Sequence, residues 1–170
     1  KAESNIYVKS PDDQLPETEK DREIIKTIVD HFSNYMFEKF CIDLFMKVEN
    51  RVIKVDHTRP TRDGGRDGVG YYKIGSSDNN IVVEFALEAK RYDLNNGVGV
   101  KEVSRLISRI KHRQFGVIIT SSYFGTQAQE EIKEDGHPII LISARDILKI
   151  LKRDNLDSVE KVKKWLIQNY

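Results

Sequence analysis

Apolar residues in this chain follow two spacings, one typical of helices and one typical of strands. Helical spacing covers residues 21–48 and ends in an apolar face made of Phe37, Phe40, Cys41, Leu44, Phe45 and Val48. Residues 1–20 are polar, contain Pro11 and Pro16 and have no apolar period. We therefore expect residues 1–20 to be a polar arm or linker, followed by one domain over residues 21–170.

Short apolar runs after residue 50 predict strands. A β-branched run covers residues 51–55, and two further runs cover residues 69–74 and 81–90. The last two are separated by residues 75–80, which are rich in the Gly, Ser, Asp and Asn typical of turns, so they predict an antiparallel hairpin.

The second half of the sequence alternates between the two spacings. Strands are expected at residues 115–120 and 138–142, and an amphipathic helix over residues 100–110 precedes them. Thr126 and Gln129 resemble a capping box for a helix that ends near Gly136. Further helices are expected from Ser143 to about Leu151 and from Ser158 onward. Strand–helix–strand order implies a parallel crossover, so the sequence predicts an α/β fold in which helices flank a mixed β-sheet.

Composition adds limits on the class of protein. The length suits one domain, and 39% hydrophobic with 32% charged residues is ordinary for a globular protein. The net charge of +1 gives no general argument for nucleic-acid binding, so that case rests on local clusters. Cys41 is the only cysteine, which excludes an internal disulfide. No apolar run approaches the ~20 residues that span a bilayer, so we expect no membrane association.

Candidate chemistry concentrates at the end of the run 81–90. Side chains alternate between the faces of a strand, so Glu88 and Lys90 should lie on the same face. Asp67 begins the preceding strand of the hairpin, and antiparallel pairing should bring it across from Glu88. Two carboxylates are the hard oxygen ligands that Mg²⁺ prefers, and Mn²⁺ could substitute for it. We expect Asp67 and Glu88 to hold the metal and Lys90 to stabilise negative charge; an isolated Glu-x-Lys is more often an exposed pair on an edge strand.

Two basic clusters are candidates for contact with DNA phosphates. Lys101, Arg105 and Arg109, followed by His112, recur every three or four residues on one expected helix. The second cluster lies in the loop before the hairpin and consists of His57, Arg59, Arg62 and Arg66. A solvated helix face remains the alternative for the first cluster.

Several motifs, in order, resemble the Mrr-type branch of the PD-(D/E)xK nucleases. They are Phe37-Glu38-Lys39-Phe40, Gly64-Gly65-Arg66-Asp67, Glu88-Ala89-Lys90-Arg91-Tyr92, Val100-Lys101-Glu102-Val103 and the apolar run from Gly116 to Ser121. The resemblance extends over about residues 37–151. It implies a restriction-endonuclease-like fold over residues 21–170, Mg²⁺-dependent hydrolysis of double-stranded DNA, and bacterial or archaeal defence in the cytoplasm. A homodimer would cut both strands.

The resemblance also implies roles for single residues. Glu38 would be a third acidic residue near the metal, or would orient Lys90; an exposed helix glutamate is the alternative. Many similar nucleases have Gln where this chain has Glu88, a difference that could tighten metal binding. Asp63, four residues before Asp67, is expected to have a role in the solvation or turn geometry of the loop and not in catalysis.

Two other functions remain open at this stage: a repair or junction-resolving nuclease, and a DNA-binding module that has lost catalysis. The intact set of Asp67, Glu88 and Lys90 argues against the second. The chain begins with Lys1, which suggests a fragment or a processed product, and a separate DNA-recognition domain in the same polypeptide is then an open alternative.

Overall fold

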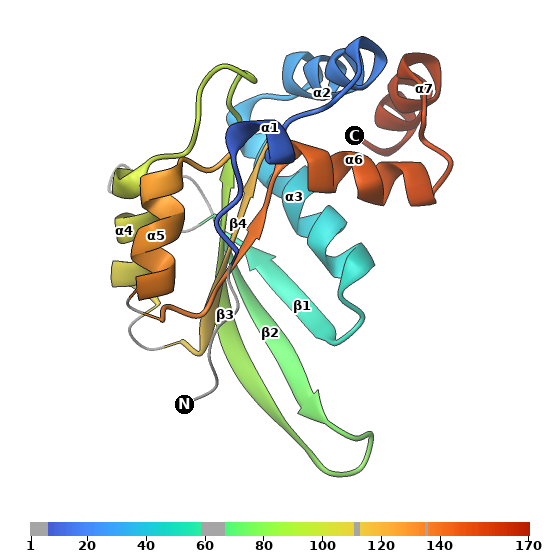
Figure 1. Cartoon of the computed structure of the whole chain (residues 1–170). Coiled ribbons are helices and arrows are strands. Elements are labelled where there is room, and N and C mark those ends of the chain that lie inside the picture. Colours follow the sequence, from blue (N-terminus) through green and yellow to red (C-terminus); the bar gives the residue numbers. More distant parts are fainter. Residues whose placement is uncertain (1–6, 59–66, 111–112, 135) are drawn as a thin grey trace.

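A five-stranded sheet passes through the molecule with helices on both of its faces (Figure 1). The computed structural model describes residues 7–58, 67–110, 113–134 and 136–170. The strands are β1 (Val52–His57), β2 (Gly68–Gly75), β3 (Asn80–Lys90), β4 (Phe115–Thr120) and β5 (Ile139–Ile142), and they lie side by side in that order. The first three pair antiparallel, and β4 and β5 add parallel to β3. This confirms the predicted mixed sheet.

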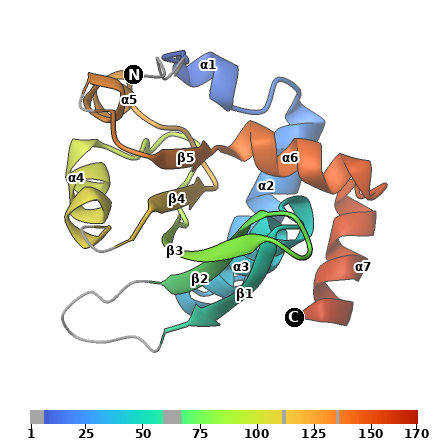
Figure 2. The ribbon, with the colours of Figure 1, turned by 90° about the horizontal axis from the view of Figure 1, so that it is seen from below.

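Helices cover the two faces unequally (Figure 2). They are α1 (Pro11–Gln14), α2 (Glu19–His31), α3 (Asn34–Val48), α4 (Val100–Arg109), α5 (Thr126–Glu134), α6 (Ala144–Arg153) and α7 (Val159–Asn169). The helical region 21–48 is therefore two helices, because Phe32 leaves helical geometry and Ser33 caps α3 by accepting a hydrogen bond from Met36 N. Ser143 and Ser158 occupy the N-cap positions where helices were expected to begin. No helix within the described ranges is both long and apolar enough to cross a bilayer.

Each face of the sheet has its own apolar core. Phe85 and Leu87 of β3 pack with α2, α3, α6 and α7, whereas Ala86 packs with α4 and α5. This follows the alternation of side chains along β3. Gly70 of β2 lies directly under the Phe85 ring, and a Cβ added there would meet that ring at 2.0 Å. The sheet thus requires glycine at this position.

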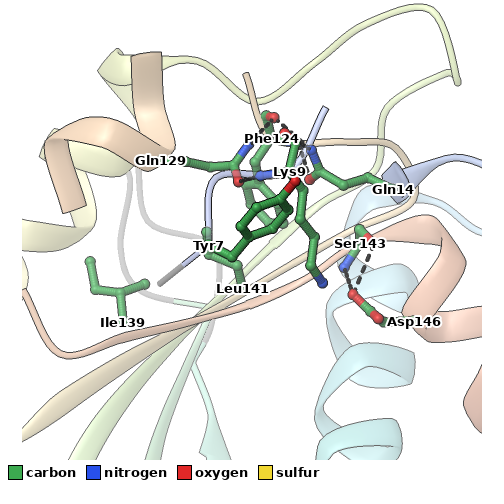
Figure 3. Close-up of a pocket in the computed structure, with 9 residues that line it drawn as sticks. All are labelled: Tyr7, Lys9, Gln14, Phe124, Gln129, Ile139, Leu141, Ser143 and Asp146. Atoms are coloured by element: carbon green, nitrogen blue, oxygen red, sulfur yellow. Dashed lines mark hydrogen bonds between the residues drawn. The ribbon is translucent and has the colours of Figure 1, made fainter. Parts of the chain in front are cut away.

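The segment before α2 is bound to the domain by side-chain amides (Figure 3). The buried Gln14 donates a hydrogen bond to Phe124 O and accepts one from Phe124 N, at 3.0 and 2.9 Å. Gln129 accepts from Lys9 N at 2.8 Å and donates to Lys9 O at 2.9 Å. The capping box expected for Thr126 and Gln129 is therefore wrong, since α5 already includes Thr126 and the Gln129 amide binds elsewhere. Residues 7–17 follow the domain surface as an attached strap.

Candidate active site

The carboxyl end of β3 brings together the three residues that the strand pattern predicted. Gly68, the first residue of β2, pairs antiparallel with Leu87 of β3. Asp67, one residue before Gly68, therefore lies opposite Glu88. Asp67 Oδ2 accepts a hydrogen bond from Ala89 N at 2.6 Å, which holds the carboxylate at the end of the sheet. Lys90 Nζ lies 3.1 Å from Glu88 Oε2. Both strands therefore contribute to one acidic and basic cluster; the catalytic roles of its members stay predictions.

Glu88 is a fully buried carboxylate between two cations. Its side chain is 0% exposed, and its Oε1 accepts a hydrogen bond from Arg109 Nη1 of α4 at 2.6 Å. Lys90 approaches Oε2, but not with hydrogen-bonding geometry, and Oε2 accepts no hydrogen bond among the described residues. Burying a carboxylate is costly unless opposite charge compensates it, so Arg109 and Lys90 together make the buried position tolerable.

Asp67 is held in an environment that disfavours its charge. Burial is the largest cause that raises its pKa, to about 6, and the hydrogen bond from Ala89 N opposes this rise. The negative charges of Glu38 and Glu88 raise the pKa further, whereas Lys90 lowers it. Burial and like charge therefore outweigh the stabilising contacts, so a bound cation would favour the ionised form.

The local chemistry fits a hard divalent cation held by two carboxylates. Among the described residues, none donates a hydrogen bond to the buried Glu88 Oε2 and none donates to Asp67 Oδ1. Within the described part of the chain, no group of three or more His, Cys, Asp or Glu residues is arranged to hold a metal. Magnesium sites commonly combine one or two carboxylates with water and other oxygen ligands, so Asp67 and Glu88 are a sufficient protein contribution.

Glu38 lies at the edge of this cluster and has a partner that the sequence did not indicate. Its charge raises the pKa of Asp67, so α3 brings Glu38 near that carboxylate, and its role at the site stays a prediction. However, Glu38 Oε2 lies 3.0 Å from Nε2 of His57, the last residue of β1. The His57 ring in turn stacks on Tyr35, with 4.3 Å between the ring centroids. His57 was grouped with the basic loop, and only the packing of α3 against β1 reveals its contact with Glu38.

The basic residues of α4 do not form one exposed stripe, which corrects the sequence-based picture. Lys101 and Arg105 are exposed, but the Arg109 side chain is 18% exposed and binds Glu88. An α-helix has about 3.6 residues per turn, so successive steps of four drift around its axis and carry Arg109 toward the buried side. A phosphate contact by Lys101 or Arg105 stays a prediction. Arg59, Arg62, Asp63, Arg66 and His112 lie outside the described residues.

The end of β4 fixes the backbone that carries Lys90. Thr120 Oγ1 and Ser121 N both donate hydrogen bonds to Lys90 O, at 2.9 and 3.2 Å. Ser121 Oγ also accepts from Tyr92 N and donates to Tyr92 O, at 2.8 and 2.7 Å. Both residues lie in a motif of the family resemblance but were given no role there, although hydroxyl side chains at the end of an apolar strand are a signal that could have indicated one.

This sheet, with an acidic pair and a lysine at the end of β3, defines a restriction-endonuclease-like nuclease fold. The family model described as a restriction endonuclease, of the Mrr catalytic type, matches residues 29–151. The chain therefore belongs to this family, the Mrr-type PD-(D/E)xK nucleases, as the sequence motifs indicated. Restriction endonucleases of this kind generally use a divalent metal.

Two solved structures resemble the chain over nearly its whole length. The chain is 46% identical to the DNA modification-dependent restriction endonuclease AspBHI, with a TM-score of 0.89, over 96% of this chain and 43% of that one. MspJI restriction endonuclease, in complex with a 27-mer oligonucleotide, has a TM-score of 0.80 at 23% identity, over 95% of this chain and 38% of that one, and shows the shared fold alone. The chain thus spans less than half the length of either relative. No curated protein sequence matches it.

Proposed function

We propose that this chain is the catalytic domain of a modification-dependent restriction enzyme, and that it hydrolyses phosphodiester bonds of double-stranded DNA with Mg²⁺. One observation carries the proposal: the Asp67 carboxylate lies opposite Glu88 and Lys90, and no residue in the described ranges donates a hydrogen bond to the buried Glu88 Oε2. Membership of the restriction endonuclease family supports a nuclease, and AspBHI supports the dependence on modified DNA.

We assign a different role in the reaction to each residue of the cluster. Asp67 and Glu88 would hold the metal, which when bound polarises a phosphate and lowers the pKa of a water molecule. Lys90 keeps its ammonium 3.1 Å from Glu88 and remains 18% exposed, so it can stabilise the negative charge that develops on the phosphate. Glu38, positioned by His57, lies at the rim, where it can orient water or Lys90.

DNA contact and recognition complete the proposal. Lys101 and Arg105 are exposed on α4, where they can bind backbone phosphates. We propose that a separate domain recognises the modified base, which the likeness to the modification-dependent enzyme AspBHI supports. A homodimer would place one such centre on each DNA strand. Since the substrate is chromosomal or invading DNA, we expect the enzyme to act in the bacterial or archaeal cytoplasm.

A plasmid-nicking assay tests this function. Supercoiled DNA, methylated or unmethylated, is incubated with the protein and Mg²⁺ or Mn²⁺, with parallel reactions in EDTA. We expect metal-dependent conversion to open-circular and linear forms, none of it in EDTA. Undiminished cleavage in EDTA would remove the metal-dependent mechanism. DNA binding without cleavage would support an inactive binding module, and preference for junction substrates would support a repair nuclease.

A further inference from the structure

We propose that Arg109 is a positioning residue of the cleavage centre: it fixes the Glu88 carboxylate so that Oε2 and Lys90 remain available to the metal and the substrate. The inference rests on the proposed nuclease function and assigns it a residue on α4. It also explains how this chain accommodates an acidic residue in a fully buried position at the active site.

The geometry singles out Arg109 from the other basic residues of α4. Its Nη1 donates to Glu88 Oε1 at 2.6 Å, a distance typical of a charge-assisted hydrogen bond. Arg113 Nη1 donates to Arg109 O at 3.1 Å, which ties down the end of the helix. Leu106, also on α4, is fully buried beneath the sheet. The guanidinium is therefore carried by a helix that packs on the sheet.

The two oxygens of Glu88 have different surroundings, and Arg109 causes the difference. Oε1 accepts the short hydrogen bond from the guanidinium, whereas Oε2 lies near Lys90 and accepts no hydrogen bond from the residues that the structure describes. Without Arg109, Lys90 would be the remaining charge partner of a carboxylate that is 0% exposed. The carboxylate would then draw the ammonium onto itself and away from the phosphate. Arg109 thus leaves Lys90 free to act on the substrate.

A purely electrostatic contact with DNA is the competing role for Arg109, and the Glu88→Gln background separates the two. A glutamine is neutral and does not require a buried counter-ion. If Arg109 acts through Glu88, its removal should matter much less once Glu88 is replaced. If Arg109 binds phosphate, its removal should cost the same in both backgrounds. The interaction between the two substitutions is therefore the informative quantity.

The experiment compares Arg109→Met, Glu88→Gln and the double variant with the unchanged chain, and Arg153→Met is the matched control. Arg153 is exposed at the end of α6. Single-turnover cleavage rates are measured across a Mg²⁺ titration, and Mn²⁺ affinity is measured by calorimetry without DNA. Replacing a residue that orients a metal ligand typically costs about 10–100-fold in affinity or activity. We expect such losses in both measurements for Arg109→Met, less than about 3-fold when it is added to Glu88→Gln, and none for Arg153→Met.

The outcomes distinguish failure of this inference from failure of the proposed function. Active wild-type protein with unchanged rate and Mn²⁺ affinity in Arg109→Met would overturn the inference alone, as would equal losses in both backgrounds. Inactive wild-type protein would overturn the proposed function, while the Mn²⁺ measurements would still decide the role of Arg109. If Arg109→Met does not fold, the double variant is compared with Glu88→Gln, where a loss above about 3-fold would overturn the inference. Arg109→Lys is then compared with wild type, and it should retain only part of the Mn²⁺ affinity, because it keeps the cation but not the guanidinium; full retention would overturn the inference.

Discussion

Replacing Asp67 by Asn should stabilise the metal-free protein, because the native carboxylate lies where its charge is disfavoured. Burial, together with the charges of Glu38 and Glu88, raises the pKa of Asp67 from 3.8 to about 6. One pKa unit corresponds to about 1.36 kcal/mol, so the ionised side chain costs the fold up to about 3 kcal/mol. An asparagine carbonyl can still accept the hydrogen bond from Ala89 N. The substitution therefore removes the unfavourable charge and keeps the favourable contact.

The pH dependence of this gain has a defined sign. A carboxyl with a raised pKa in the folded state contributes stability below its unfolded pKa, and that contribution is lost as pH rises through the folded pKa. For Asp67 the loss falls between pH 3.8 and about 6. The advantage of Asp67→Asn should therefore be absent near pH 4, grow up to about pH 6 and stay constant above pH 7.

Chemical and thermal unfolding in EDTA measure this effect. At pH 8 we expect a rise in Tm of up to about 12 °C, taking about 2–4 °C per kcal/mol for a protein of this size. Adding Mg²⁺ at one hundred times its Kd should stabilise wild type by about 2.7 kcal/mol and leave the variant unchanged. The difference in unfolding free energy between the two proteins should therefore become smaller. A variant that is less stable than wild type at pH 8 in EDTA, or a gain that does not vary with pH, would refute the reasoning.

Three further predictions concern cleavage, DNA binding and packing. Lys90→Ala should abolish cleavage in a folded protein. Glu88→Gln should retain measurable activity at a higher Mg²⁺ requirement, because an amide oxygen can still face a metal, and a metal titration of the cleavage rate compares the two variants. Changing Lys101 and Arg105 together to Ala should weaken DNA binding and flatten its salt dependence, as measured by anisotropy at several salt concentrations; an unchanged slope would make them a solvated face. Gly70→Ala should destabilise the fold by about 1–3 kcal/mol in urea unfolding, because the new methyl group meets an aromatic ring at 2.0 Å.

The strand pattern was sufficient to predict which residues meet at the centre of the candidate site. Alternation along β3 placed Glu88 and Lys90 on one face, and the hairpin brought Asp67 opposite Glu88. These positions depend on the two-residue period of a strand and on antiparallel pairing, which are local properties of the sequence. For the same reason the mixed sheet and most helix boundaries were predictable.

Contacts between distant side chains were not predictable in this way. Periodicity placed Arg109 with two exposed basic residues, but the structure folds it onto Glu88, 21 positions earlier in the chain. His57 and Glu38 meet only because α3 packs on β1. Gln129 matched a local capping pattern, yet its amide binds Lys9, 120 positions away. In each case the side chain binds a residue that is distant in the sequence, instead of the role that the local pattern indicates. Such a partner comes close only when the chain is folded.

The most direct test of the central claim is single-turnover cleavage of double-stranded DNA by wild type and Asp67→Asn in parallel Mg²⁺ titrations, with circular dichroism as the control for folding. Asp67, directly before the first residue of β2, is the carboxylate that lies opposite Glu88 and Lys90. The account predicts saturable, Mg²⁺-dependent cleavage by wild type and none by the folded variant at any Mg²⁺ concentration. Cleavage by the folded variant at the wild-type rate and with the same Mg²⁺ dependence would contradict it.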